Sequence, residues 1–151
     1  MNMKPYLLLV LCGILVIAGV VYAQLEPVAV DIDVKPDKEL NPINVKDKGK
    51  KKGKTPVAIL GSDTFDVMTV DPASVVLGDA TALRCAVQDV NADGFADLEC
   101  QVYTTEIGVE CGDTEVSLSA MLTDGTPITG SDNVTPVGCK EPKGPKEPKG
   151  T

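Results

Sequence analysis

The chain has 151 residues, with 22 acidic and 14 basic side chains, no histidine and no tryptophan. Without histidine, it cannot form a Ser/His/Asp or Cys/His catalytic arrangement or a histidine-ligated metal centre. Between Pro56 and Cys139 the sequence has 14 acidic side chains and one basic one, Arg84, and an acidic body of this kind repels nucleic acid and anionic membranes.

The N-terminus has the features of an export signal. An apolar run extends from Tyr6 to Val21 and ends in VYA at 21–23, a small-residue pattern that signal peptidase cuts after. We therefore expect residues 1–23 to be removed, the mature chain to begin at Gln24, and the protein to be secreted, periplasmic or attached to the cell surface. The alternative is an uncleaved anchor, because the run is close to the shortest length that spans a bilayer.

Residues 24–139 are predicted to form one domain of short β-strands. VAVDIDV at 28–34 alternates apolar and acidic residues, the period-two pattern of a strand with one buried face. PVAILG at 56–61 is a continuous apolar run closed by glycine, which is typical of a buried strand. Further strands are expected in SVVLG (74–78), LRCAVQ (83–88), LECQVY (98–103), EVSLSAML (115–122) and PITG (127–130). Spacing of roughly ten residues favours an all-β fold, a single β-sandwich of the immunoglobulin-like or a related type.

Two segments between the strands predict local turns. DTFDVMTVDP at 63–72 allows a helical turn, with Pro72 suited to a first helical position after Asp71. TDGT at 123–126 predicts a tight turn that joins the strand before it to the strand after it.

Lysines gather in two segments outside the acidic body. Eight lysines fall between Lys35 and Lys54, most of them in KDKGKKKGK at 46–54. Glycines between the lysines favour a solvated loop, and the alternative is a contact with polyanions such as lipopolysaccharide or an acidic exopolysaccharide. Residues 140–151, KEPKGPKEPKGT, have a proline every few residues and no apolar side chain, so we expect a disordered or extended tail.

Four cysteines remain after removal of residues 1–23, an even number that predicts two disulfides in an exported chain. Four cysteines allow three connectivities. We favour Cys85 with Cys100, because this pair brackets an acidic loop, and Cys111 with Cys139, because this bridge would tie the last strand to the body. A zinc site is the alternative, but the sequence has neither CxxC spacing nor histidine.

The acidic loop at 89–97 predicts a Ca²⁺ site. Its residues offer oxygen atoms as a calcium loop requires, from side chains at loop positions one, three, five and nine and from a backbone carbonyl at seven. These residues are Asp89, Asn91, Asp93, Asp97 and, through its carbonyl, Phe95. Two carboxylates about 4 Å apart repel each other by roughly 4 kcal/mol at an effective dielectric constant near 20, so converging carboxylates favour a bound cation over a plain acidic turn. Position twelve is Cys100 instead of the glutamate of an EF-hand, so we expect weak binding, with a dissociation constant of about 10⁻⁴ to 10⁻³ M.

Residues 89–98 follow the pattern DxNxDGxxDL and resemble the calcium loops of dockerin repeats, thrombospondin type 3 repeats and integrin β-propeller repeats. This resemblance implies calcium binding and no particular biological function. A wider resemblance is carried by VDIDVKP (30–36), PVAILGSDTFDV (56–67), VDPASVVLG (70–78), QDVNADGFADLECQV (88–102) and GDTEVSLSAMLTDGTPITGSD (112–132). In this order the segments resemble an uncharacterised domain of exported bacterial proteins. That resemblance implies a secreted or surface β-domain and carries no catalytic residue.

Together these features predict a secreted, calcium-stabilised structural or interaction module that is not an enzyme. The mature chain has only Phe65, Phe95 and Tyr103 as aromatic residues, which leaves little to line a substrate cleft. We expect its partner to be an unknown protein or polysaccharide at the cell surface, with no nucleic acid and, after signal removal, no membrane. The alternative is a calcium-dependent carbohydrate-binding module, although the exposed aromatic platforms of such modules usually include tryptophan.

Overall fold

The computed structural model describes residues 25–46 and 53–140. The predicted signal segment, the middle of the lysine-rich segment and the tail beyond Lys140 lie outside the described residues. In the part that is described, no helix has the length and apolar character needed to cross a membrane.

The described residues form β-strands and short 3-10 helices, which confirms the all-β prediction. The first sheet has the order β1 (Val28–Ala29), β10 (Pro127–Asn133), β9 (Glu115–Met121), β5 (Val76–Leu77) and β6 (Ala80–Thr81). The second sheet has the order β2 (Ile32–Val34), β4 (Lys54–Ile59), β8 (Asp97–Tyr103) and β7 (Arg84–Gln88). A two-stranded sheet joins β11 (Thr135–Val137) to β3 (Pro42–Asn44). The 3-10 helices are η1 (Val67–Thr69), η2 (Pro72–Ser74) and η3 (Thr104–Glu106).

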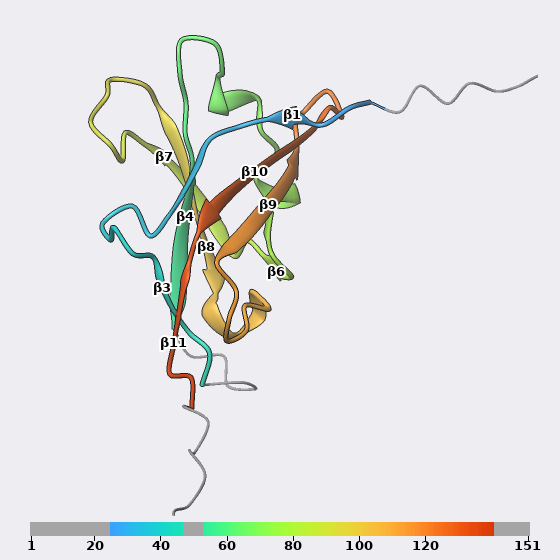
Figure 1. Ribbon diagram of the computed structural model, residues 1–151. Helices are drawn as coiled ribbons and strands as arrows, with labels where there is room; N and C mark the ends of the chain where they lie inside the picture. Colours follow the sequence, from blue (N-terminus) through green and yellow to red (C-terminus); the bar gives the residue numbers. More distant parts are fainter. Residues whose placement is uncertain (1–24, 47–52, 141–151) are drawn as a thin grey trace, which may run out of the picture.

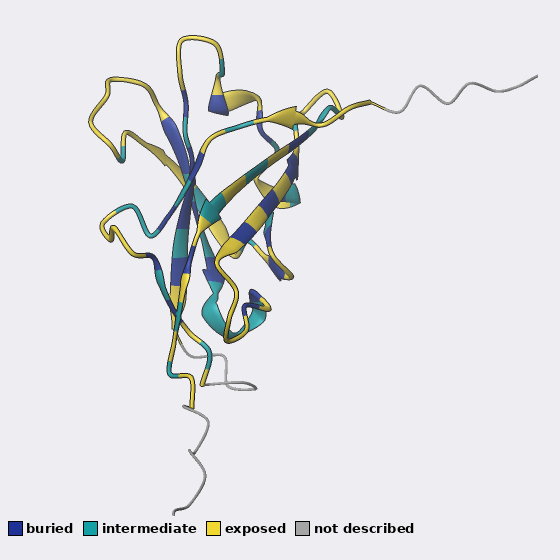
Figure 2. Ribbon diagram, in the orientation of Figure 1, coloured by how far each residue is buried: buried dark blue, intermediate teal, exposed yellow. Residues whose placement is uncertain are grey.

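The two larger sheets enclose the hydrophobic core, an arrangement consistent with a β-sandwich (Figure 1). Leu118 and Ile128 enter the core from the first sheet, and Val57 and Val102 enter it from the second; all four are buried. Burial alternates residue by residue along β9, as a strand with one solvated face requires (Figure 2). Strand β4 lies between β2 and β8 and is buried along most of its length, as its continuous apolar run predicts.

The structure corrects the prediction of one strand at 28–34. Val28–Ala29 pairs with β10 in the first sheet, whereas Ile32–Val34 pairs with β4 in the second. The chain crosses from one sheet to the other close to Gly130. A Cβ atom added to Gly130 would lie 2.5 Å from the Val30 carbonyl oxygen. The alternating pattern therefore belongs to a segment that changes sheets.

Both predicted turns are confirmed. The Asp71 carboxylate accepts a hydrogen bond of 3.0 Å from the Ala73 amide, and Pro72 is the first residue of η2. In the turn between β9 and β10, the Leu122 amide donates to the Thr126 carbonyl at 2.8 Å.

The structure contains the two disulfides that the sequence favours. Cys85 and Cys100 lie directly opposite each other in β7 and β8, with 4.0 Å between their Cα atoms. This is the short spacing of a pair that exchanges no backbone hydrogen bonds in an antiparallel ladder. Cys111 and Cys139 have a Cα–Cα distance of 5.8 Å, and their bridge joins the end of the described chain to the segment before β9.

Candidate metal-binding loop

The acidic loop joins β7 to β8 at one end of the molecule, away from β11 (Figure 1). The Asp89 carboxylate accepts hydrogen bonds from the backbone amides of Asp93, at 3.2 Å, and of Gly94, at 3.0 Å. The Asn91 side-chain oxygen accepts from the same Asp93 amide, at 3.0 Å. Because two side-chain oxygens share one amide, loop positions one and three converge.

Asp93, at loop position five, lies with Asp89 and Asn91. The Asp93 carboxylate accepts 2.9 Å hydrogen bonds from the Asn91 side-chain amide and from the Phe95 backbone amide. Left-handed backbone at Ala92, with φ 60°, and at Gly94, with φ 92°, curls the chain around these side chains. An added Cβ atom at Gly94 would meet no other atom within 4 Å. Glycine is therefore favoured here by the left-handed backbone and not by a lack of space.

Asp97, at loop position nine, has a different environment. Its side chain is completely buried. One carboxylate oxygen accepts from the Gly61 amide and the other from the Val90 amide, both at 2.8 Å. The bond from Gly61 fastens the loop to the chain that follows β4, and the bond from Val90 closes the loop on itself. Gly61 is a residue that the sequence analysis missed, and an added Cβ atom there would collide with the Ala96 carbonyl.

The structure thus brings Asp89, Asn91 and Asp93 together and directs Asp97 toward two backbone amides. The Phe95 side chain is exposed. Across residues 25–46 and 53–140, no three or more Asp, Glu, His or Cys side chains gather in a group that could hold a metal ion. Backbone amides and the Asn91 amide are the donors found on the loop carboxylates within the described residues.

Comparisons of this chain with protein-family models, with curated proteins and with solved structures found no match.

Proposed function

We propose that this protein is an exported, non-catalytic structural or interaction module of the immunoglobulin-like or a related sandwich type, stabilised by Ca²⁺ in loop 89–97. The observation that carries the proposal is the amide of Asp93, which Asp89 and Asn91 share at 3.2 and 3.0 Å. This shared amide holds the Asp89 carboxylate and the Asn91 side-chain oxygen, two possible calcium ligands, near each other.

The donor chemistry of the loop fits calcium. Calcium takes six to eight oxygen ligands, including carboxylates, amide oxygens, backbone carbonyls and water. The side chains of Asp89, Asn91 and Asp93 and the carbonyl of Phe95 would hold the ion. Both Asp97 oxygens already accept a backbone amide, but a carboxylate oxygen has a second lone pair, so Asp97 keeps capacity for the ion or for a water bound to it. A bound ion would supply positive charge that offsets repulsion between the carboxylates.

The structural role follows from where the loop lies. The Cys85–Cys100 bridge spans 15 residues of sequence and closes the same hairpin that carries the loop. In the chain-entropy model, a closed loop of about 15 residues contributes about 3 kcal/mol to the free energy of unfolding. Calcium at a hundredfold excess over its dissociation constant would add about 2.7 kcal/mol. Together they would hold one end of the second sheet. Two disulfides also fit an oxidising compartment.

Thermal unfolding of the mature chain with added Ca²⁺ and with EDTA tests the proposal, together with calorimetric titration of Ca²⁺. We expect saturating Ca²⁺ to raise the melting temperature by about 10 °C. Asp93→Ala should abolish this rise. Asp124→Ala is the matched control, because Asp124 is also exposed and also accepts an amide two residues later, at 2.9 Å from Thr126. Equal melting temperatures of the unmodified chain in Ca²⁺ and in EDTA would refute the calcium site.

A further inference from the structure

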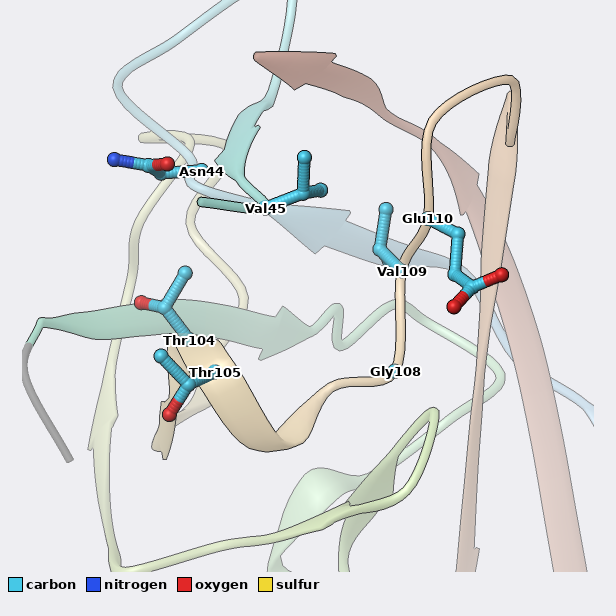
Figure 3. A pocket seen from close by; sticks show the side chains of 7 residues that line it. All are labelled: Asn44, Val45, Thr104, Thr105, Gly108, Val109 and Glu110. Atoms are coloured by element: carbon cyan, nitrogen blue, oxygen red, sulfur yellow. The ribbon is translucent and has the colours of Figure 1, made fainter. Parts of the chain in front are cut away.

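Three adjoining hollows mark the end of the molecule where β3, β11 and η3 meet. The central hollow, of about 220 Å³, lies between Asn44, Val45 and the two threonines of η3 on one side and Glu110 on the other (Figure 3). A second hollow, of about 400 Å³, shares Asn44 and both threonines, Thr104 and Thr105. A third, of about 410 Å³, shares Val45 and Glu110. The three hollows share lining residues and therefore adjoin; we name the surface that they form together the basic end.

Lysines line the outer parts of the basic end. Lys35 and Lys54 line the second hollow, and Lys46 and Lys140 line the third. Of the five lysines in the described ranges, only Lys38 lines neither of these hollows. Four of the six basic side chains in the described ranges therefore line this one end of the domain, and most other charged residues of those ranges are acidic.

The fold fixes the positions of this lining. The Thr104 amide donates to the Gly53 carbonyl at 3.2 Å, and its hydroxyl lies 2.9 Å from the Thr55 hydroxyl, which joins η3 to β4. The Lys46 amide donates to the Asn44 side-chain oxygen at 2.9 Å. The stem of Lys46 lies against Gly138, where an added Cβ atom would approach the Lys46 Cγ atom to 2.9 Å.

The lining also indicates which kind of anion fits. Hydroxyl and amide groups of Thr104, Thr105 and Asn44 can hydrogen-bond to sugar hydroxyls, and the lysine ammonium groups can pair with carboxylates. The residues lining the three hollows include no aromatic side chain, so recognition there would rest on charge pairing and hydrogen bonds and not on stacking of nucleic acid bases or sugar rings. Glu110 adds a carboxylate to the central hollow and to the third hollow, where Lys46 also lies, so a sugar carboxylate is expected at the lysine ammonium groups and away from Glu110.

We propose that the basic end binds an acidic polysaccharide, by pairing sugar carboxylates with Lys46 and Lys54 and by hydrogen-bonding sugar hydroxyls to Thr105. This inference rests on the proposed role as an exported interaction module and names the class of its partner. It does not depend on calcium, because the acidic loop lies elsewhere in the fold, between β7 and β8.

Binding of hyaluronan oligosaccharides to the mature chain tests the inference, measured by calorimetry in EDTA at low and at physiological ionic strength. Hyaluronan carries one carboxylate in each disaccharide, and dextran serves as the neutral control. We expect hyaluronan to bind, dextran not to bind, and the affinity to fall as salt rises. The double variant Lys46→Glu/Lys54→Glu should bind at least about tenfold more weakly, a change that corresponds to about 1.4 kcal/mol.

Two control variants separate a specific site from general charge attraction. Arg84→Glu reverses a described positive charge that lines none of the three hollows and should bind hyaluronan within about twofold of the unmodified chain. Thr105→Val keeps every charge and should weaken binding by about tenfold, as expected for a lost hydrogen bond to the ligand. Circular dichroism confirms that each variant is folded.

Several outcomes would overturn the inference: no hyaluronan binding, equal effects of Arg84→Glu and the double variant, or tighter binding to vesicles of anionic phospholipid or to single-stranded DNA than to hyaluronan. Because binding is measured in EDTA, failure here leaves the calcium-dependent melting test unaffected. Loss of the calcium effect alone would likewise leave the basic end intact. Binding that appears only when Ca²⁺ is added would instead support a calcium-dependent carbohydrate-binding module.

Discussion

Asp97→Asn should destabilise the domain even in EDTA, because the Asp97 carboxylate holds two backbone amides besides being a candidate calcium ligand. Both oxygens of the buried Asp97 carboxylate accept backbone amides at 2.8 Å, from Gly61 and from Val90. Asparagine keeps the size of the side chain and one acceptor oxygen, but it turns its NH₂ group toward one of these amides. The change replaces a hydrogen bond to a charged group by two facing donors, which costs about 1.5–3 kcal/mol of the free energy of unfolding.

Urea denaturation followed by circular dichroism, in EDTA and again in saturating Ca²⁺, measures this loss. Asp89→Asn is the control, because Asp89 is exposed and accepts amides only within its own loop. It should lower stability little in EDTA and should cancel much of the calcium effect. If Asp97→Asn costs no more than Asp89→Asn in EDTA, Asp97 is not the residue that fastens the loop to β4.

Two further changes test the crossing of the chain between sheets and the charges beside it. Gly130→Ala places a Cβ atom 2.5 Å from the Val30 carbonyl oxygen and should cost about 1–3 kcal/mol in urea denaturation; a cost no larger than that of alanine at an exposed neighbour on β10 would refute the close crossing. Burial, followed by repulsion from Asp132 and Asp37, raises the pKa of Asp33. Its charge therefore opposes folding once the pH rises through the folded-state pKa, and the penalty vanishes below the unfolded-state value. Asp33→Asn should raise the melting temperature at neutral pH but not at about pH 3, and an equal rise at both would argue against a charge effect.

Local patterns in the sequence were sufficient to predict the strands that form the core. From Pro56 onward β4 is a continuous apolar run, which predicts a buried strand. β9 alternates with a period of two, which predicts a strand with one face toward the core. The sequence also favoured the Cys85–Cys100 pairing among three possible connectivities, because these cysteines bracket the acidic loop. Their opposite positions in the β7–β8 ladder are a finding of the structure.

Features that depend on distant partners could not be predicted in this way. β3 and β11 are each three residues long and contain proline, so neither has a recognisable strand pattern, and each forms by pairing with the other across the chain. The role of Asp97 depends on Gly61, which lies 36 positions earlier in the sequence. Loop spacing predicted an inward-facing carboxylate but not the amide that this carboxylate meets.

The positions of the first and last strands determine how the domain would respond to tension. The described chain enters beside β1 and leaves after β11, at opposite ends of the molecule (Figure 1). β1 runs parallel to β10, and β11 runs parallel to β3. A force that pulls the two ends apart therefore loads the β1–β10 pair in shear, so that its hydrogen bonds must rupture together and not one after another. The Cys111–Cys139 bridge would carry such a force past β11 to the segment before β9, which would protect the β11–β3 pair.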